Sequence, residues 1–460
     1  MATQTRTQGP PDGSTDAASV FARARAVSSR TWHLVSLAVG LIFILWLQRG
    51  QWFFFDEWAF LGPNHPGLFE PHVGHWSTSP LVIFIGLRKW FGLGSYFPFA
   101  LAVTVIHLAV AHLNWRISVR AGATAWVATA VTSVFIVLGA GAENILWAFQ
   151  IGFLGAIALG LLAFLLAMTP DMTRGRFFAV LAISLFSLTW SGTSIPLAMA
   201  TAAMLWAKSG RRRAIAFAAV MGLVYVTWYV TFTLASSSSV DAGGLGLNKI
   251  FVKMPEFIGV MTLLGFQTVF PVWGMGAAVL IALGLWLIVA YRKRLPVRGL
   301  LPASILTGAA VVFALMSAFS RAELSVGSGR ASRYVYYLVL LLLPLCALAL
   351  TRMALRGVAW RTGIAASLAV LLAFQGSQLA RAATAEAARE LGSERLISAA
   401  LYLWVSDPHS VDLTARPDPK WAPDVNLGDL AILYDDGQLP ISNFGAGELG
   451  IERTNVGIKP

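Results

Sequence analysis

Two adjacent carboxylates, Asp56 and Glu57, lie within the aromatic stretch 53–58 (FFFDEW), soon after the first long apolar segment of the chain. Removing a carboxylate from water is costly, so two of them among aromatic side chains at a membrane surface indicate a chemical role. A carboxylate in such a place can orient or deprotonate an acceptor hydroxyl during group transfer. Both residues are therefore candidate catalytic bases, and the alternative is that they cap a helix or solvate the loop.

Arginines late in the chain offer the complementary charge. The stretch 330–334 (RASRY) contains Arg330, Arg333 and Tyr334, and Arg321 precedes it. The arginine fork pairs with phosphate through two hydrogen bonds and stays charged when partly desolvated. We therefore expect these four residues to bind a phosphate group, although arginines at the ends of membrane spans also reach toward lipid headgroups.

Other side chains of the same predicted loops are candidate substrate contacts. They are His72, His75, Glu143, Arg88, Trp58 and Gln150. His72 and His75 are three residues apart, a spacing that would put both on one helical face, and with Glu70 they could ligate a divalent metal. No fourth ligand is evident, so no metal site is predicted and no cofactor is required, although a divalent cation stays open.

Composition decides the class of protein. The chain has 460 residues, of which 57% are hydrophobic and 12% charged, and its mean hydropathy is +0.68. Soluble domains carry about twice that share of charge, so a soluble globule is excluded. Uncharged runs of about 20 residues predict an all-α polytopic membrane protein. We predict eleven spans, at 31–48, 96–115, 122–140, 145–168, 177–190, 194–207, 214–235, 271–291, 299–319, 334–351 and 362–380.

The distribution of lysine and arginine predicts the orientation. With a cytoplasmic N-terminus, the basic loops between these spans fall on one side, as the positive-inside rule requires. The formal net charge of +12 is thus explained by topology, and no nucleic-acid partner is expected. The stretch 80–93, which contains Arg88 and Lys89, is too short and too charged to cross, and predicts an outer interfacial helix. A break at 191–193 predicts a hairpin from two short spans.

Three regions follow from this assignment. Residues 1–30 are polar and predicted to be a disordered cytoplasmic segment. Residues 31–380 form the transmembrane domain, with a first outer loop at 49–95. Residues 381–460 hold 7 basic and 12 acidic residues and predict a small extracytoplasmic domain, beginning with a helix at 384–405. Cys346 is the single cysteine, so no intramolecular disulfide can form.

The chain resembles integral-membrane glycosyltransferases of the GT-C fold, which use polyprenyl-phosphate sugars. The resemblance rests on Asp56-Glu57 in a long outer loop, the interfacial helix at 80–93, the stretch 72–75 (HVGH), Glu143-Asn144, and the arginines at 330–334. It implies that an acidic residue of the first outer loop is the catalytic base and that arginines hold the donor phosphate. Those roles fall here on Asp56 and on Arg330 or Arg333.

Two hypotheses of different classes remain. The first is a membrane hexosyl- or pentosyltransferase that moves a sugar from a polyprenyl-phosphate donor to an extracytoplasmic glycan, lipid or protein. The second is a transporter or flippase of a lipid-linked saccharide, with the broken hairpin lining the path. A polymerase or ligase acting on lipid-linked glycans is a third option. All three place the chain in a cell membrane, and a bacterial plasma membrane is expected.

Overall fold

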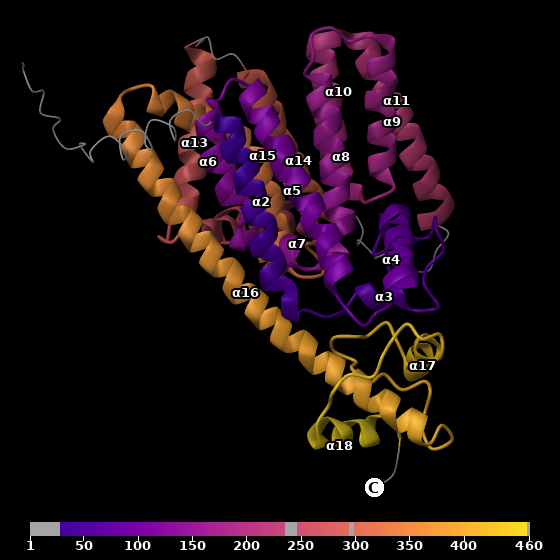
Figure 1. Cartoon of the computed structure of the whole chain (residues 1–460). Helices are drawn as coiled ribbons and strands as arrows, with labels where there is room; N and C mark the ends of the chain where they lie inside the picture. The colour runs from indigo at the N-terminus through magenta and orange to yellow at the C-terminus, as the bar shows by residue number, and fades with distance from the viewer. Residues whose placement is uncertain (1–27, 235–245, 294–298, 458–460) are drawn as a thin grey trace, which may run out of the picture.

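The computed structural model describes residues 28–234, 246–293 and 299–457, which form helices almost throughout (Figure 1). Within these residues the strands are β1 (Pro71–His72) and β2 (His75–Trp76), which pair as a short hairpin. The predicted all-helical membrane fold is confirmed. The segment 1–30, predicted to be disordered, lies outside the described residues except for its last three.

Every predicted span overlaps a helix, because an apolar run in lipid must satisfy its own backbone hydrogen bonds. The helices are α2 (Ser29–Leu47), α5 (Phe97–Arg120), α6 (Ala125–Ile136), α8 (Ile151–Ala167), α9 (Arg174–Leu188), α10 (Ile195–Ser209), α11 (Arg211–Trp228), α13 (Met275–Arg292), α14 (Leu300–Arg321), α15 (Ser332–Ala354) and α16 (Val358–Ser406). By length and composition, nine helical stretches of the described residues could cross a membrane, or ten if the bent pair Ala125–Ile136 and Gly139–Leu146 is one span; the nine include Lys249–Val269, which is outside the eleven helices above. The chain is a multi-pass membrane protein.

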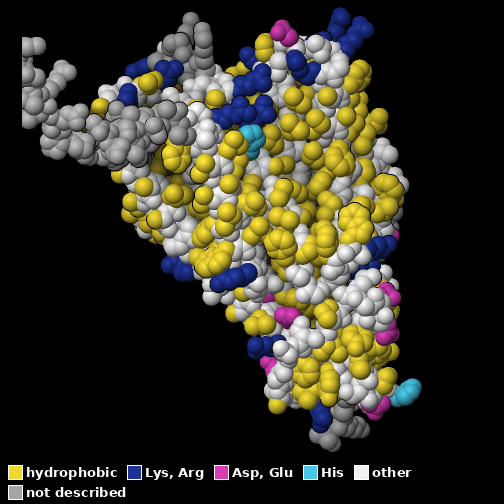
Figure 2. All heavy atoms as spheres, viewed as in Figure 1, with side chains coloured by type: hydrophobic (Ala, Val, Ile, Leu, Met, Phe, Trp, Pro, Cys, Tyr) yellow, Lys and Arg dark blue, Asp and Glu magenta, His cyan; other side chains and the backbone are white. Residues whose placement is uncertain are grey.

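The two ends of the helix bundle differ in charge. Lys208 and the arginines 211–213 lie where α10 passes into α11, and Figure 2 shows lysine and arginine side chains gathered at that upper end. We call it the basic end. The opposite end, here the loop end, carries the short elements η1 (Gln48–Gly50), α3 (Glu57–Leu61), α4 (Thr78–Phe91), η2 (Gly139–Gly141), α7 (Ala142–Leu146), η3 (Ala148–Gln150) and η9 (Val326–Arg330).

The helices α9 and α10 form the predicted hairpin. They have 15 residues each, and the turn between them contains η4 (Gly192–Ser194). At 1.5 Å per residue such a helix is about 22 Å long, which is less than the roughly 30 Å of a bilayer core. Because α9 starts and α10 ends at the basic end, the turn between them stops short of the far surface and is available to line a cavity there.

One long helical segment lies outside the predicted spans. It consists of η6 (Lys249–Lys253), α12 (Met254–Gly259), η7 (Val260–Gly265) and η8 (Phe266–Val269). At its start, Lys249 Nζ lies 3.6 Å from Glu323 Oε2, just beyond α14. At its end, Gln375 Nε2 donates to the Val269 carbonyl at 2.8 Å, while Gln375 Oε1 accepts from the Ala140 N–H. Both ends therefore contact the loop end of the bundle, and the segment returns to it instead of crossing.

The stretch predicted at 80–93 forms the helix α4, whose 14 residues are too few for a span. Arg88 at its C-terminal end is buried and donates hydrogen bonds to the carbonyls of Leu61 and Gly62. These bonds fasten the C-terminal end of α3 to α4. The guanidinium thus helps fix the first loop.

The last predicted span and the helix predicted at 384–405 are one helix, α16, of 49 residues. It crosses the bundle and continues past the loop end, where α17 (Leu427–Asp435) and α18 (Ala446–Asn455) lie beside its second half (Figure 1). The predicted domain boundary at 381 falls inside it. Glu390 of α16 accepts a hydrogen bond from the Trp52 N–H at 2.8 Å, so this helix also holds the start of the first loop.

Candidate active site

A cavity of about 660 Å³ opens at the loop end between elements that are far apart in the sequence. The first loop, the hairpin β1–β2, the turn between α9 and α10, the end of α14, the start of α15 and the second half of α16 all contribute to its wall. The cavity brings together most of the predicted site residues. Those that line it are Asp56, His72, His75, Glu143, Gln150, Arg321, Arg333 and Tyr334.

Asp56 is half-buried on the cavity wall, and its carboxylate has no hydrogen-bond partner among the described residues. The preceding residue, Phe55, has a φ of 54°, which is unfavourable for an aromatic residue and turns the chain sharply at this point. The Phe55 N–H donates to the Trp421 carbonyl, which holds the turn. The backbone therefore presents the Asp56 carboxylate to the cavity.

Burial raises the pKa of Asp56 to about 6, and the negative charge of Asp424 adds to the rise. The guanidinium groups of Arg333 and Arg321 act in the opposite direction. A carboxyl with a pKa close to neutrality can accept a proton from a hydroxyl and release it again. The electrostatic setting of Asp56 thus suits a general base.

Glu57 points the other way and is fully buried. Its Oε2 accepts from the Phe54 N–H at 3.0 Å, and its Oε1 accepts from the Tyr96 hydroxyl at 2.8 Å and from the Phe149 N–H at 3.1 Å. Burial raises the pKa of Glu57 well above its ordinary value, against the effect of these hydrogen bonds. The carboxyl is occupied by backbone groups and does not line the cavity. Its position is that of a residue that shapes the loop.

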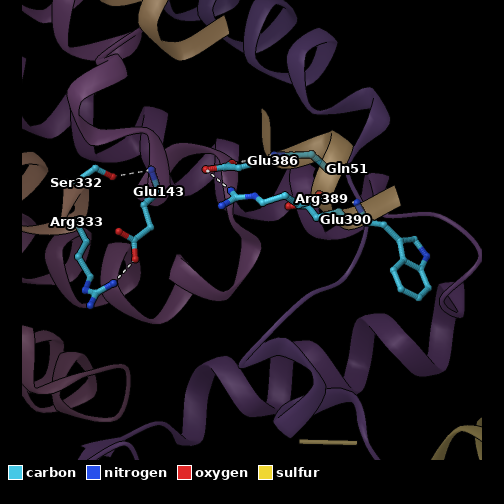
Figure 3. A network of polar contacts seen from close by, with 8 residues as sticks. Gln51, Glu143, Ser332, Arg333, Glu386, Arg389 and Glu390 are labelled. Atoms are coloured by element: carbon cyan, nitrogen blue, oxygen red, sulfur yellow. Dashed lines mark hydrogen bonds and ion pairs between the residues drawn. The ribbon is translucent and has the colours of Figure 1, made fainter. Parts of the chain in front are cut away.

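The predicted phosphate ligands separate into two groups. Arg333 lines the cavity and forms an ion pair with Glu143 (Figure 3). It also lies over the Tyr334 ring, with 5.2 Å between its guanidinium carbon and the ring centroid. The Glu143 N–H also donates to Ser332 Oγ at 3.0 Å. Arg321 lines the cavity without an ion pair among the described residues. Arg330 is exposed and is not part of this wall.

The two histidines sit on a hairpin, so their predicted shared helical face is wrong. His72 and His75 are cross-strand partners, and the turn between them places Val73 and Gly74 at φ of 49° and 77°. Cross-strand partners face the same side of a sheet, which still brings both rings to the cavity. Burial lowers the pKa of each to about 4. Both are neutral, and the described residues contain no cluster of three groups able to hold a metal ion.

Two predicted substrate contacts lie in the wall behind the cavity. Trp58 is fully buried, with its ring centroid 5.4 Å from that of Trp52. Arg88 is engaged by the carbonyls at the end of α3. Gln150, by contrast, precedes α8 and does line the cavity.

Comparison with known proteins adds one finding. No protein-family profile and no curated protein sequence matches this chain. Among solved structures it is similar to the "Crystal Structure of ArnT from Cupriavidus metallidurans bound to Undecaprenyl phosphate", with a TM-score of 0.54 and 16% sequence identity over 93% of this chain and 88% of that one. The chain has the fold of ArnT. The predicted resemblance to the GT-C fold is therefore confirmed.

The C-terminal part also contributes to the cavity, although no site residue was predicted there from the sequence. Trp421, Arg389 and Glu386 also line the cavity. The Arg389 guanidinium carbon lies 5.3 Å from the centroid of Trp421. Glu386 accepts from the Gln51 amide at 3.3 Å, and Figure 3 shows Glu386 beside Arg389. A tryptophan between prolines in an acidic segment was the available signal, since exposed aromatics often mark binding surfaces. The contact of Trp421 with the first loop could not be predicted from the residues around it in the sequence.

Proposed function

We propose that the protein is a membrane glycosyltransferase that moves a hexose or pentose from a polyprenyl-phosphate donor to a hydroxyl of a glycan, lipid or protein. One observation carries the proposal: Asp56 and the guanidinium groups of Arg321 and Arg333 line the same cavity. The fold supports it, because the ArnT of the solved structure is bound to undecaprenyl phosphate. That lipid carries the kind of phosphate that two arginines can bind.

The chemistry assigns one role to each side. Asp56 accepts the proton of the acceptor hydroxyl, whose oxygen then bonds to the anomeric carbon of the sugar. The bond from that carbon to the phosphate oxygen breaks, and polyprenyl phosphate leaves with the electron pair. Arg321 and Arg333 stabilise the charge that grows on the phosphate as the bond breaks. Because these charges belong to the chain itself, the step as written needs no divalent cation.

The orientation is part of the proposal. Lysines and arginines gather at the basic end, which by the positive-inside rule faces the cytosol. The cavity and the C-terminal segment then face away from the cytosol, where the acceptor is met. The donor keeps its phosphate at the level of Arg321, at the end of α14.

Radiolabel transfer in proteoliposomes tests the proposal. Vesicles containing the protein and a panel of polyprenyl-phosphate sugars should yield labelled acceptor, and Asp56→Asn should abolish the transfer. Asp435→Asn, an exposed carboxylate at the end of α17, is the matched control and should retain it. If no donor supports transfer while the vesicles move a lipid-linked saccharide across the bilayer, the protein is a flippase and the proposal fails.

A further inference from the structure

A second large cavity lies on the side of α15 that is turned away from the candidate active site. Its volume is about 900 Å³, and it is lined by α6, α13, α15, α16 and the segment 266–272 (Figure 1). None of the described residues that line it also lines the active-site cavity. Tyr337 stacks on Phe313 of α14, at the active-site cavity, with 4.0 Å between ring centroids. Val339, about 200° further around the helix, lines the second cavity.

A smaller cavity of about 510 Å³ adjoins the second one, and the two form a forked space. We call the 900 Å³ cavity the long limb and the 510 Å³ cavity the short limb. The short limb lies between the end of α15 and the start of α16, beside Trp360 and Gly363. The residues that line both limbs are Leu350, Met353, Ser367 and Leu368. The limbs therefore meet near the end of α15.

The mouth of the forked space carries positive charge. Arg352 and Arg356 line the long limb within one helical turn of the shared residues, and they are the charged side chains of both linings among the described residues. Both are exposed at the basic end. Gly357 has a φ of 147° and a ψ of −178°, a conformation that is close to exclusive to glycine, and turns the chain directly into α16. Arg361 Nε donates to the Ala354 carbonyl at 3.1 Å, which fastens the two helices together.

The shape and the charge of this space match a phospholipid. Two apolar limbs that meet at one mouth suit a ligand with two hydrocarbon chains, and the two guanidinium groups suit its phosphate. The long limb follows α15 from Val339 to Met353, or about 21 Å, which is enough for an acyl chain that fills one half of a roughly 30 Å bilayer core. A polyprenyl phosphate has a single chain and would leave one limb empty.

The orientation selects the leaflet and the headgroup. In the orientation proposed above the basic end faces the cytosol, and the cytoplasmic leaflet is the one that carries anionic lipids. Arginines at the ends of spans also reach toward headgroups of the surrounding membrane. What sets Arg352 and Arg356 apart is that they line the cavity in which the chains of the same lipid can lie.

We propose that the forked space binds one anionic phospholipid of the cytoplasmic leaflet, with its phosphate at Arg352 and Arg356 and one acyl chain in each limb. This site is separate from the active-site cavity, and its chemistry does not depend on the sugar donor or the acceptor. A lipid bound there would fill the space between α13, α15 and α16 and stabilise that part of the bundle.

Native mass spectrometry of the purified, delipidated full-length chain tests the headgroup. Dioleoyl phosphatidylglycerol is anionic, and dioleoyl phosphatidylcholine has the same chains without net charge. The anionic lipid should bind about tenfold more tightly, because two arginines attract it. The double variant Arg352→Gln, Arg356→Gln should lose this preference. Arg116→Gln, an exposed arginine at the same end of α5 and outside both limbs, should keep it. Equal binding of the two lipids by the wild type, or an equal loss in Arg116→Gln, would overturn the proposal.

The number of chains is tested with lysophosphatidylglycerol, which has the same headgroup and one chain. It should bind about three- to tenfold more weakly than the two-chain lipid, because the contacts of one chain with the protein are lost. Gly363→Leu should fill the short limb, since a Cβ at Gly363 meets no heavy atom within 4 Å. It should weaken the two-chain lipid to the level of the lysolipid and leave the lysolipid unchanged. Gly284→Leu on α13, equally open and outside both limbs, is the matched control. Unchanged two-chain binding in Gly363→Leu would refute the forked site.

Bare polyprenyl phosphate distinguishes this site from the donor site. Under the proposed function its phosphate binds at Arg321 and Arg333, so it should not displace phosphatidylglycerol. Displacement would assign the forked space to the polyprenyl chain and overturn the phospholipid proposal. Selective binding of phosphatidylglycerol by a protein that transfers no sugar would support the lipid site and refute the glycosyltransferase alone.

Discussion

Charged side chains at the loop end have different partners in two regions, the packed wall behind the cavity and the cavity surface. In the wall, Glu57, Arg88 and Glu390 are buried and each forms hydrogen bonds with main-chain groups of the first loop or of α3. On the surface, Asp56 has no hydrogen bond and Arg321 no ion pair among the described residues. We infer from this difference that charge bound to backbone holds the loop, and that the charged groups lining the cavity are the ones that meet a ligand.

Adjacent residues illustrate the division most clearly. Asp56 and Glu57 have the same chemistry, yet the left-handed Phe55 and the first turn of α3 send their side chains in opposite directions. One carboxyl reaches the cavity, and the other accepts from Phe54, Tyr96 and Phe149. The account therefore predicts opposite phenotypes for substitutions at neighbouring positions.

Among the residues that hold the donor, the largest effect is expected from the arginines of the cavity surface. Arg333→Ala should lower kcat/KM for the donor by about 10²–10³-fold, because a cation that stabilises charge on the leaving phosphate is lost. Arg330→Ala, three residues earlier and exposed, should change it less than twofold. Initial rates across donor concentrations measure both. Equal losses of kcat/KM in the two variants would contradict the distinction between Arg333, which lines the cavity, and Arg330, which is exposed outside it.

For a residue of the packed wall we expect a loss of stability instead of a loss of activity. Glu57→Gln replaces an acceptor oxygen with an amide NH₂ that faces main-chain N–H groups, so a buried donor loses its partner. Stability should fall by about 1–3 kcal/mol, while the rate per folded molecule is largely kept. Thermal unfolding in detergent, followed by assay of the soluble fraction, separates the two quantities. If the Glu57→Gln variant unfolds at the wild-type temperature but its soluble fraction is inactive, Glu57 acts in catalysis and the prediction is wrong.

The smallest effect concerns pH. Since the base must be ionised, kcat/KM should fall tenfold per unit below a pH of about 6, the pKa of Asp56. His72 and His75 stay neutral above pH 5 because burial lowers their pKa to about 4, so their titration does not affect the pH profile of kcat/KM above pH 5. Asp424→Asn removes a negative charge that raises the pKa of Asp56, so the acidic fall of kcat/KM should shift to lower pH. Asp435→Asn should not move it, and a shift to higher pH with Asp424→Asn would be inconsistent with this charge arrangement.

Local patterns were sufficient for most of the fold. The length of apolar runs located the eleven helices, and the short spans around 191–193 indicated the α9–α10 hairpin. The segment 249–269 was missed because lysines at its start and glycines along it interrupt the apolar run, although it forms a helix against the loop end. The continuity of α16 was also missed, since polar residues after 380 look like the end of a span.

The site was predictable where charge is rare and unpredictable where contacts are distant. Asp56, Arg321 and Arg333 stood out because charged residues in membrane-proximal loops need a reason. Glu57 is buried because it accepts hydrogen bonds from Tyr96 and Phe149, and Arg88 because it donates to carbonyls at the end of α3. No local sequence pattern reveals these contacts. Trp421 reaches the cavity only through long-range packing, so its place there could not be read from its neighbours.

The most direct test compares sugar transfer by Asp56→Asn and Glu57→Gln in the same proteoliposomes, normalised to folded protein. The account predicts that Asp56→Asn lowers the transfer rate by about 10²–10⁴-fold with unchanged folding, and that Glu57→Gln keeps most of the wild-type rate. An active Asp56→Asn variant beside an inactive Glu57→Gln variant would contradict it and assign the chemistry to the buried carboxyl.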